Sequence, residues 1–453
     1  MSSRGQGAGN SLVALFAAVF LFMFADTVLQ TILPVTLKET GAASAGVIGL
    51  MVALPQGVGF ITALPASAYG DTRGRARMAS WAACVATLAS LVAVAAVGRS
   101  VAWWLLPVLG LGLTRLVVWT STLATVSTSG DPHMMQGLNG ATQRGAAAVA
   151  AVATAVVVAR QAWSSAYFGI AVSYALLLPL SLIALHRVGE GRDLFPRPTE
   201  SYRFAAEVVI RDPAMRASSL VGMCAMTVMT LGSSFFALTL DASPRQVAST
   251  LAILLLTRDV TSIAVGPLLP QVLRRFGIGG TVVVATACGG VGVAALTIPT
   301  QAWPVTAVAA VLQGASICLC IGCTNLLAVG SRGGRVAGSG LRIASSNLGG
   351  CVGSLFLPVG MGAVLEHGGR TLLFASAAAV TALLGAGARW STRSLSLAGD
   401  ADADGDGSTP PPRAWRPSHR RLDRPPVLQS VPSPTEGNGP TEARTSDPAR
   451  SKE

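Results

Sequence analysis

Long apolar runs recur along most of the chain and confine its charged residues to short stretches between them. Twelve of these runs reach the length of about 20 residues that a helix needs to cross a bilayer core. They cover residues 12–34, 46–69, 79–98, 101–126, 138–159, 163–186, 217–240, 247–270, 280–299, 302–329, 338–363 and 371–389. Because lipid offers no hydrogen-bonding partners, each run must satisfy its backbone internally, as a helix does. The sequence therefore predicts an all-α integral membrane protein with twelve transmembrane helices.

The charge content agrees with a membrane protein and argues against nucleic-acid binding. Only 12% of the 453 residues are charged, whereas a soluble domain has about 25%. The net charge of +12 could suggest a nucleic-acid partner, but such proteins gather basic residues on one water-facing patch. Here the basic residues lie singly between apolar runs, so we expect the lipid bilayer and not a nucleic acid as the partner.

The basic residues also predict the orientation, since cytoplasmic loops carry the excess of Lys and Arg. With the N-terminus inside, the inner loops hold thirteen basic residues and the outer loops hold five. The inner set is Arg73, Arg75, Arg77, Arg187, Arg192, Arg197, Arg203, Arg211, Arg216, Arg274, Arg275, Arg332 and Arg335, and the outer set is Lys38, Arg99, Arg160, Arg245 and Arg370. We expect both termini in the cytoplasm. The preference for Arg over Lys and the richness in Ala and Gly indicate a bacterial plasma membrane.

Matching residues recur at a constant offset of 203. Matching positions within residues 108–126 and 311–329 are Val108, Leu109, Leu123 and Val126 with Val311, Leu312, Leu326 and Val329. Gly137, Leu138, Ala141 and Thr142 correspond to Gly340, Leu341, Ala344 and Ser345, and residues 71–74 to 274–277. Such a repeat is the signature of a duplicated unit. Since each unit has an even number of runs, the two copies have the same orientation and are related by an axis along the membrane normal.

The predicted domains follow from this duplication and from two changes in composition. Residues 1–186 form an N-terminal six-helix half and residues 217–390 a C-terminal half. Between them, residues 187–216 form a charged cytoplasmic linker that holds a short surface helix around Tyr202 to Arg211. Residues 391–453 are rich in Pro, Ser, Asp and Arg, and such a segment buries too little apolar area to offset its ordering entropy. We expect a disordered cytoplasmic tail.

The loop after the second run resembles a signature of the major facilitator superfamily. Residues 67–77 read SAYGDTRGRAR, similar to the pattern G-x-L-A-D-R-x-G-R at the same place in that family, with Asp71, Gly74 and Arg75 as the matching positions. The resemblance implies two parallel six-helix repeats and transport by alternating access. It also implies that Asp71 lies against the N-terminal end of the eleventh span, where it locks the outward-open state, with Gly74 and Arg75 completing this gate.

Two further stretches resemble multidrug exporters of the same superfamily. Asp26 to Pro34 is similar to the pattern D-x-T-x-x-x-x-x-L-P of the first span, with one residue fewer, and Leu113-Thr114-Arg115 resembles the fourth-span signature with its intramembrane Arg. The Gly-Pro of drug/proton antiporters is absent from the fifth span. The resemblance favours an exporter of drugs or metabolites, and the missing Gly-Pro keeps an importer open.

Four charged residues lie near the middle of apolar runs, where charge is costly and usually functional. Asp26 and Arg115 lie at matching depths in the first and fourth spans, so they can pair, and we expect proton coupling at Asp26, Arg115, Arg258 and Asp259. Polar or aromatic residues that can line the same cavity are Gln30, Gln56, Trp119, Asn325 and Asn347. Static ion pairs that fix helix packing are the alternative interpretation.

Two expectations concern how these charges are paired. Neighbours in a helix point about 100° apart, so Arg258 and Asp259 are expected to need separate partners. Arg144 and Arg342 lie near the predicted cytoplasmic ends of their runs, where long side chains reach the interface. We therefore expect both to be surface residues.

The function that these features predict is secondary active transport. We expect a monomer that exports a small amphipathic organic compound by proton antiport; the alternatives are a proton-coupled importer of a nutrient and, from another class, an integral-membrane enzyme or sensor. We expect no enzyme activity, catalytic residue or cofactor. The chain has no phosphate-binding Gly-Lys-Ser/Thr loop, so ATP is not expected to be the energy source. Cys318, Cys320 and Cys323 have no His nearby in the sequence, so they are read as small apolar residues and not as a metal site.

Overall fold

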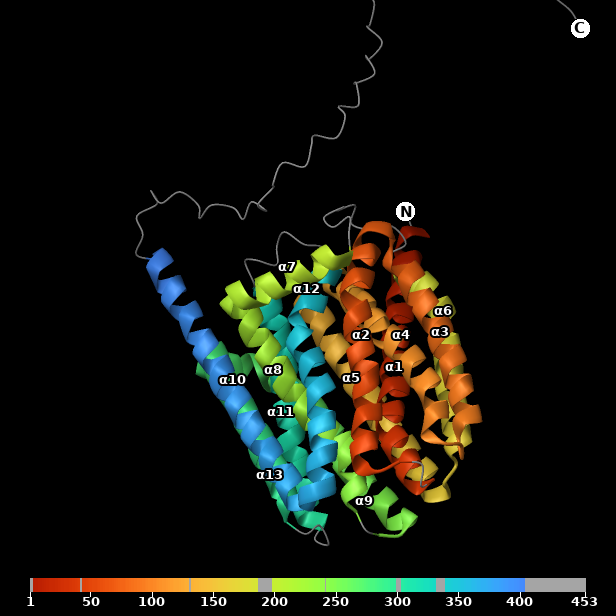
Figure 1. Ribbon diagram of the computed structural model, residues 1–453. Coiled ribbons are helices and arrows are strands. Elements are labelled where there is room, and N and C mark those ends of the chain that lie inside the picture. Colours follow the sequence, from red (N-terminus) through yellow and green to blue (C-terminus); the bar gives the residue numbers. More distant parts are fainter. Residues whose placement is uncertain are drawn as a thin grey trace, which may run out of the picture. The chain divides into compact units, whose positions relative to one another are not determined.

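The computed structural model describes residues 3–40, 43–129, 132–185, 198–240, 242–298, 303–330 and 339–403, and helices make up almost all of this part of the chain (Figure 1). The α-helices are α1 (Ser3–Glu39), α2 (Ala45–Arg73), α3 (Arg75–Ala96), α4 (Val101–Thr128), α5 (Pro132–Arg160), α6 (Trp163–Ala184), α7 (Pro198–Arg211), α8 (Pro213–Thr230), α9 (Pro244–Val265), α10 (Leu269–Ala294), α11 (Trp303–Gly330), α12 (Ser339–Ser346) and α13 (Leu348–Ala403). Short helical segments of other types are η1 (Leu231–Phe235), η2 (Ala237–Thr239), η3 (Gly266–Leu268) and η4 (Ala295–Thr297).

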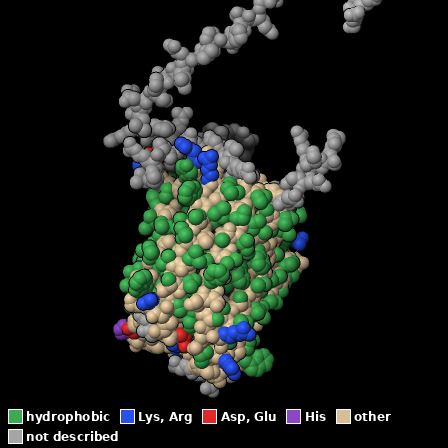
Figure 2. Space-filling model, turned by 90° about the vertical axis from the view of Figure 1, so that its right-hand side faces the viewer, with side chains coloured by type: hydrophobic (Ala, Val, Ile, Leu, Met, Phe, Trp, Pro, Cys, Tyr) green, Lys and Arg blue, Asp and Glu red, His purple; other side chains and the backbone are tan. Residues whose placement is uncertain are grey.

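Ten helical stretches of the described residues are long and apolar enough to cross a membrane. Large apolar side chains such as Trp81, Leu106, Phe356 and Leu383 are more than half exposed on the outer surface. Figure 2 shows hydrophobic side chains over the middle of one face, with the charged ones mainly toward its two ends. An exposed apolar band of this kind is what a lipid environment requires, and the chain is a multi-pass membrane protein.

Two of the ten stretches contain a glycine at which the helix is interrupted. Gly277 within α10 has a φ of 62°, and Gly369 within α13 has a φ of 68°. Gly74, between α2 and α3, has a φ of 108°. Only glycine adopts these left-handed values without strain. Gly74 and Gly277 are 203 residues apart, so the repeat found in the sequence recurs as the same kind of turn.

The helix α7 lies at the end of the bundle where the N-terminus and α12 are found (Figure 1). It is the short helix expected around Tyr202 to Arg211, and it packs Phe204 against Leu64 and Leu341. Asp212 then caps α8, since its Oδ1 accepts the backbone N–H of Ala214 at 2.8 Å. We call this the α7 end of the bundle; the start of α9 lies at the opposite end.

The N-terminal helices contact the C-terminal ones along two lines, α2 against α13 and α5 against α9. Helices α2 and α13 approach closely because each has a glycine at the contact, Gly49 and Gly362. A Cβ on Gly49 would come within 2.3 Å of the carbonyl oxygen of Pro358. A third contact joins α1 to η1, a π-helical turn in which the hydroxyl of Ser234 donates to the carbonyl of Gln30 at 2.9 Å.

The last helix differs from the expected boundary at residue 390. Helix α13 continues to Ala403, because the prolines and most of the glycines of the tail come only after residue 404. Residues 404–453 and the first part of the predicted linker, 187–197, lie outside the described residues, as do Arg332 and Arg335.

Candidate functional site

The deep charges of the first and fourth spans form an ion pair. Asp26 on α1 and Arg115 on α4 are 4% and 8% exposed. Arg115 Nη2 donates to Asp26 Oδ2 at 2.9 Å, and its Nε contacts the other carboxylate oxygen. Gln30, one turn further along α1, also donates to Asp26. The ion pair that the matching depths of the two residues predict is present. The Asp26 carboxylate accepts from a charged donor, Arg115, and from a neutral donor, Gln30.

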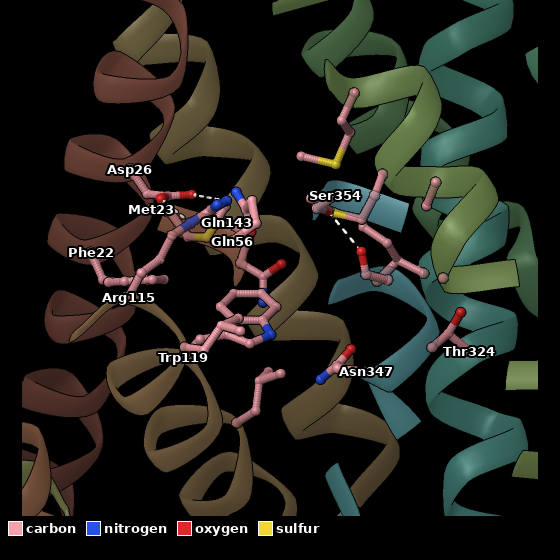
Figure 3. A pocket seen from close by; sticks show the side chains of 18 of the residues that line it. Phe22, Met23, Asp26, Gln56, Arg115, Trp119, Gln143, Thr324, Asn347 and Ser354 are labelled. Atoms are coloured by element: carbon pink, nitrogen blue, oxygen red, sulfur yellow. Dashed lines mark hydrogen bonds and ion pairs between the residues drawn. The ribbon is translucent and has the colours of Figure 1, made fainter. Parts of the chain in front are cut away.

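This pair lies at the wall of the cavity shown in Figure 3. The cavity has a volume of about 120 Å³ that is accessible to a water-sized sphere, and it is lined from α1, α2, α4, α5, α8, α11, α13 and the junction of α12 and α13. Its lining residues are Phe22, Met23, Asp26, Gln56, Arg115, Leu116, Trp119, Leu123, Gln143, Arg144, Gly222, Ala225, Met226, Met229, Ile321, Thr324, Asn325, Asn347, Gly350 and Ser354. Both halves of the chain therefore contribute to one central space.

Four of the five residues predicted to line a cavity do so here: Gln56, Trp119, Asn325 and Asn347. The fifth, Gln30, instead lines a smaller adjoining pocket, which also touches Asp26 and Arg115. The apolar part of the large cavity is built from aromatic and thioether side chains, with Trp119 packed on Phe22 at 6.0 Å between ring centroids. Methionine adapts to varied ligand shapes, so this surface suits an apolar ligand body.

The charges of the eighth span agree with the expectation only for Asp259, which has a partner on another helix. Arg258 and Asp259 were predicted to need separate partners, yet Arg258 Nε lies 3.3 Å from Asp259 Oδ1. The long Arg side chain folds back beside its own helix, which the angle between neighbouring Cα–Cβ bonds does not prevent. Asp259 also lies 3.6 Å from Arg144 Nη1 on α5. Neither Arg258 nor Asp259 is among the residues that line the cavity.

Arg144 was expected at the membrane interface, and that expectation is wrong. Its exposure is only 5%, and it lines the cavity beside Gln143. The reason is tertiary: α9 packs along α5 and covers this part of it, so the side chain pairs with Asp259 instead of reaching water. The position of Arg144 inside the apolar run 138–159 is the sequence signal of its burial. The side chain of Arg342 lies outside the described residues.

The residues of the predicted gate meet at the α7 end. Asp71 is buried, and its Oδ2 accepts the backbone N–H of Leu341 at 3.0 Å, near the N-terminus of α12. Its other oxygen accepts from Arg75 Nη2 at 2.8 Å. Gly74 makes the turn between them. The carboxylate thus lies where the resemblance placed it, at the positive end of a helix dipole.

The opposite end of the bundle is also bridged. Lys38 Nζ donates to the carbonyl of Leu238 at 3.0 Å, and the backbone N–H of Gly46 donates to Glu366 Oε2 at 2.9 Å. These bonds join N-terminal to C-terminal helices, as the Asp71 contact does at the α7 end. The described residues therefore connect the two groups of helices above and below the central cavity.

A multi-pass helical bundle with a central cavity lined from both halves, and with ionic side chains buried at its wall, has the architecture of a membrane transporter. The chain belongs to the Major Facilitator Superfamily, whose family profile matches residues 15–354. Membership of this family makes it a transporter and not an enzyme. A search of the curated proteins found no significant match.

Solved structures of other transporters share the fold. A human organic anion transporter is 15% identical with a TM-score of 0.62, covering 84% of this chain and 99% of the other. A nucleoside transporter is also 15% identical, with a TM-score of 0.63 and the same coverage. A POT family transporter in complex with a thioalcohol-conjugated peptide is 10% identical, with a TM-score of 0.64, covering 87% and 97%. At these identities the likeness concerns the fold alone.

Proposed function

We propose that this transporter exports a small amphipathic organic compound in exchange for protons. The observation that carries the proposal is the Asp26–Arg115 pair at the wall of a largely apolar cavity. Asp26 is the one acidic residue among the described residues that line this cavity. A buried carboxylate facing a substrate space is suited to take up and release a proton as access to it alternates.

The contacts of Gln30 offer a route from proton binding to helix movement. Its side chain donates to Asp26, while its backbone carbonyl accepts from Ser234 on η1 in the other group of helices. Protonation of Asp26 removes the charge that holds Arg115 and Gln30, so the α1–η1 contact loses part of its support. Binding of a proton to Asp26 and formation of the α1–η1 contact therefore oppose each other. Exchange transport requires such coupling.

We further propose that the chain crosses the membrane twelve times, in two parallel six-helix repeats. The breaks at Gly277 and Gly369 divide two of the ten apolar stretches and so raise the number to twelve. The halves then span residues 1–186 and 217–390, with the linker 187–216 between them and the tail 391–453 after them. Rocking of these halves about the cavity is the corresponding mechanism.

The proposed orientation places the α7 end in the cytoplasm of a bacterial cell. The sequence assigns thirteen basic residues to the inner loops, and among the described ones α7 carries Arg203 and Arg211 at this end. The excess of basic residues over the five of the other end favours this direction. The protein works as a monomer in the plasma membrane, with both termini on the cytoplasmic side.

Proton-driven import of a nutrient is the second candidate function. One observation favours it: the fifth span, within α5, lacks the Gly-Pro of drug/proton antiporters. Export and import share the same proton site. They differ in the direction of the proton relative to the substrate, which a flux measurement separates.

The experiment that tests the proposal is proton flux in vesicles containing the purified protein with Asp26→Asn. We measure the internal pH with a trapped dye while amphipathic test compounds are added outside under an imposed pH gradient. Wild type is expected to move protons when a substrate is present, and the variant is expected to lose at least nine tenths of this flux, since its amide cannot ionise. Glu207→Gln, on the surface of α7, is the control. Unchanged flux in Asp26→Asn would refute the mechanism.

A further inference from the structure

The buried charges of the described residues do not balance. The buried acidic side chains are Asp26, Asp71 and Asp259, and the buried arginines are Arg75, Arg115, Arg144 and Arg258. Two pairs are complete, Asp71 with Arg75 and Asp26 with Arg115. The third carboxylate, Asp259, is shared by the guanidinium groups of Arg144 and Arg258. One positive charge is in excess, and it belongs to the cluster between α5 and α9.

Within this cluster Arg144 is the member that reaches the cavity. It lies 3.6 Å from Asp259, longer than the 2.7–2.9 Å of a strong charge-assisted hydrogen bond. Arg258 approaches the same carboxylate at 3.3 Å and lies away from the cavity. A buried cation without a full counter-charge is costly. The arrangement therefore leaves binding capacity for an anion at Arg144, on the cavity side.

The repeat shows that this charge is a specific departure from symmetry. At the offset of 203, Asp259 corresponds to Gln56, and Arg144 corresponds to Asn347. Gln56 and Asn347 also line the cavity, from α2 and from the junction of α12 and α13. The side of the cavity formed by α2 and the junction of α12 and α13 thus has two neutral polar residues. The equivalent positions on α9 and α5 hold an ion pair. The positive charge is concentrated at the α5 side.

The rest of the lining sets the other requirement on a ligand. Phe22, Trp119, Met226 and Met229 present aromatic and thioether surface to the same space. Arg115 does not compete for an anion, since Asp26 already holds it. A ligand that satisfies both features has one anionic group and an apolar body.

We propose that Arg144 binds the anionic group of the transported compound, which makes monovalent amphipathic organic acids the substrate class. The guanidinium fork matches a carboxylate with two parallel N–H donors. The ligand carboxylate then competes with Asp259, which stays paired with Arg258. This assignment rests on the proposed transport function but not on its direction or its coupling to protons.

The test is equilibrium binding to the purified full-length protein in lipid nanodiscs. The probes are three matched sets, each with a carboxylic acid, its amide and the corresponding amine: 4-phenylbutyric, 3-indolepropionic and 2-naphthylacetic acid and their derivatives. Ligand stabilisation against heat reports affinity. We expect at least one acid to bind about tenfold more tightly than its amide, as a hydrogen bond to a charged group contributes.

Substitutions of Arg144 then assign the preference to this side chain. Arg144→Gln is expected to weaken binding of the acid at least tenfold and to leave binding of the amide within twofold. Arg144→Lys keeps the charge but not the fork, so a reduced preference for the acid should remain. The control is Arg245→Gln, an exposed position on α9 outside the cavity, which should bind as wild type does.

The outcomes separate this inference from the proposed function. It is overturned if no acid binds better than its amide, or if Arg144→Gln retains the preference. Arg144→Gln leaves Asp259 paired with Arg258, so it should fold; if it does not, an undiminished preference in Arg144→Lys overturns the inference as well. A preference for acids together with unchanged proton flux in Asp26→Asn refutes the proton mechanism only.

Discussion

At the scale of single residues, the organisation of this protein depends on how few carboxylates neutralise its buried arginines. Asp26, Asp71 and Asp259 each hold at least one guanidinium, and each lies at a contact between helices distant in sequence. Asp259 differs because Arg144 and Arg258 share it. A carboxylate shared in this way is a point at which one substitution leaves two charges without a partner.

Asp259→Asn is therefore expected to lower stability substantially. Breaking a buried ion pair by removing one partner costs about 3–5 kcal/mol, because an uncompensated charge remains. The measurement is thermal unfolding in nanodiscs, and a second substitution, Arg144→Gln, should restore part of the loss by removing one of the two cations. Glu207→Gln, whose partner Arg211 is largely exposed, should change stability by less than about 1 kcal/mol. A midpoint for Asp259→Asn equal to that of wild type would contradict this account.

At the scale of elements, α2 and the first part of α13 form an antiparallel pair with a carboxylate at each end. Asp71, near the end of α2, accepts from the start of α12, and Glu366, within α13, accepts from Gly46 at the start of α2. Between these ends the helices approach closely at Gly49 and Gly362, since a Cβ on Gly362 would meet the carbonyl of Ala45 at 2.6 Å. Helix α2 thus contacts the C-terminal group of helices at both ends of the bundle, through α12 at the α7 end and through α13 at the other.

The close approach at Gly49 can be tested by adding one methyl group. Gly49→Ala is expected to push α13 away from α2 at the end opposite α7, because Pro358 contributes a rigid backbone carbonyl there. Hydrogen–deuterium exchange should rise in the peptides that cover residues 44–52 and 356–368, and not at the α7 end. Gly169→Ala on α6 is the matched control, since a Cβ there meets no atom within 4 Å. Equal exchange in the two variants would show that this contact does not close the bundle.

At the scale of the whole molecule, the helices, core clusters and cavity of the described residues all belong to one compact unit, Met1–Asp404. Residues 405–453 lie outside the described part of the chain. Their Pro- and charge-rich composition cannot supply apolar burial to the helices. The stability of the transporter and its transport cycle should therefore be independent of this segment.

Deletion of residues 405–453 is expected to leave both properties intact. The thermal midpoint should shift by less than about 2 °C, because no part of the helical core is removed. Proton flux in vesicles should stay within twofold of the full-length protein. If the truncated protein folds normally but no longer transports, the tail has a role in the cycle, as the sensor hypothesis requires.

The membrane helices of this protein and the contacts of three of its buried charges could be predicted from the sequence. The apolar runs determine the membrane helices, because a segment in lipid must satisfy its own backbone regardless of what surrounds it. The cost of burying charge marked Asp26 and Arg115 as a pair, and the loop motif located Asp71 at the start of α12. The first two inferences use local or pairwise information that the sequence contains, and the third rests on the resemblance of the loop to the family motif.

Four of the cavity residues were expected from the sequence, but tertiary structure alone decided that Arg144 also faces the cavity. Arg144 and Arg342 look alike in sequence, but only the packing of α9 on α5 reveals that Arg144 is buried against Asp259. The rotation and tilt of each helix set such contacts, and these depend on all of its neighbours at once. The fold could therefore be predicted from the chain, whereas the excess charge at Arg144 emerged only from the packed molecule.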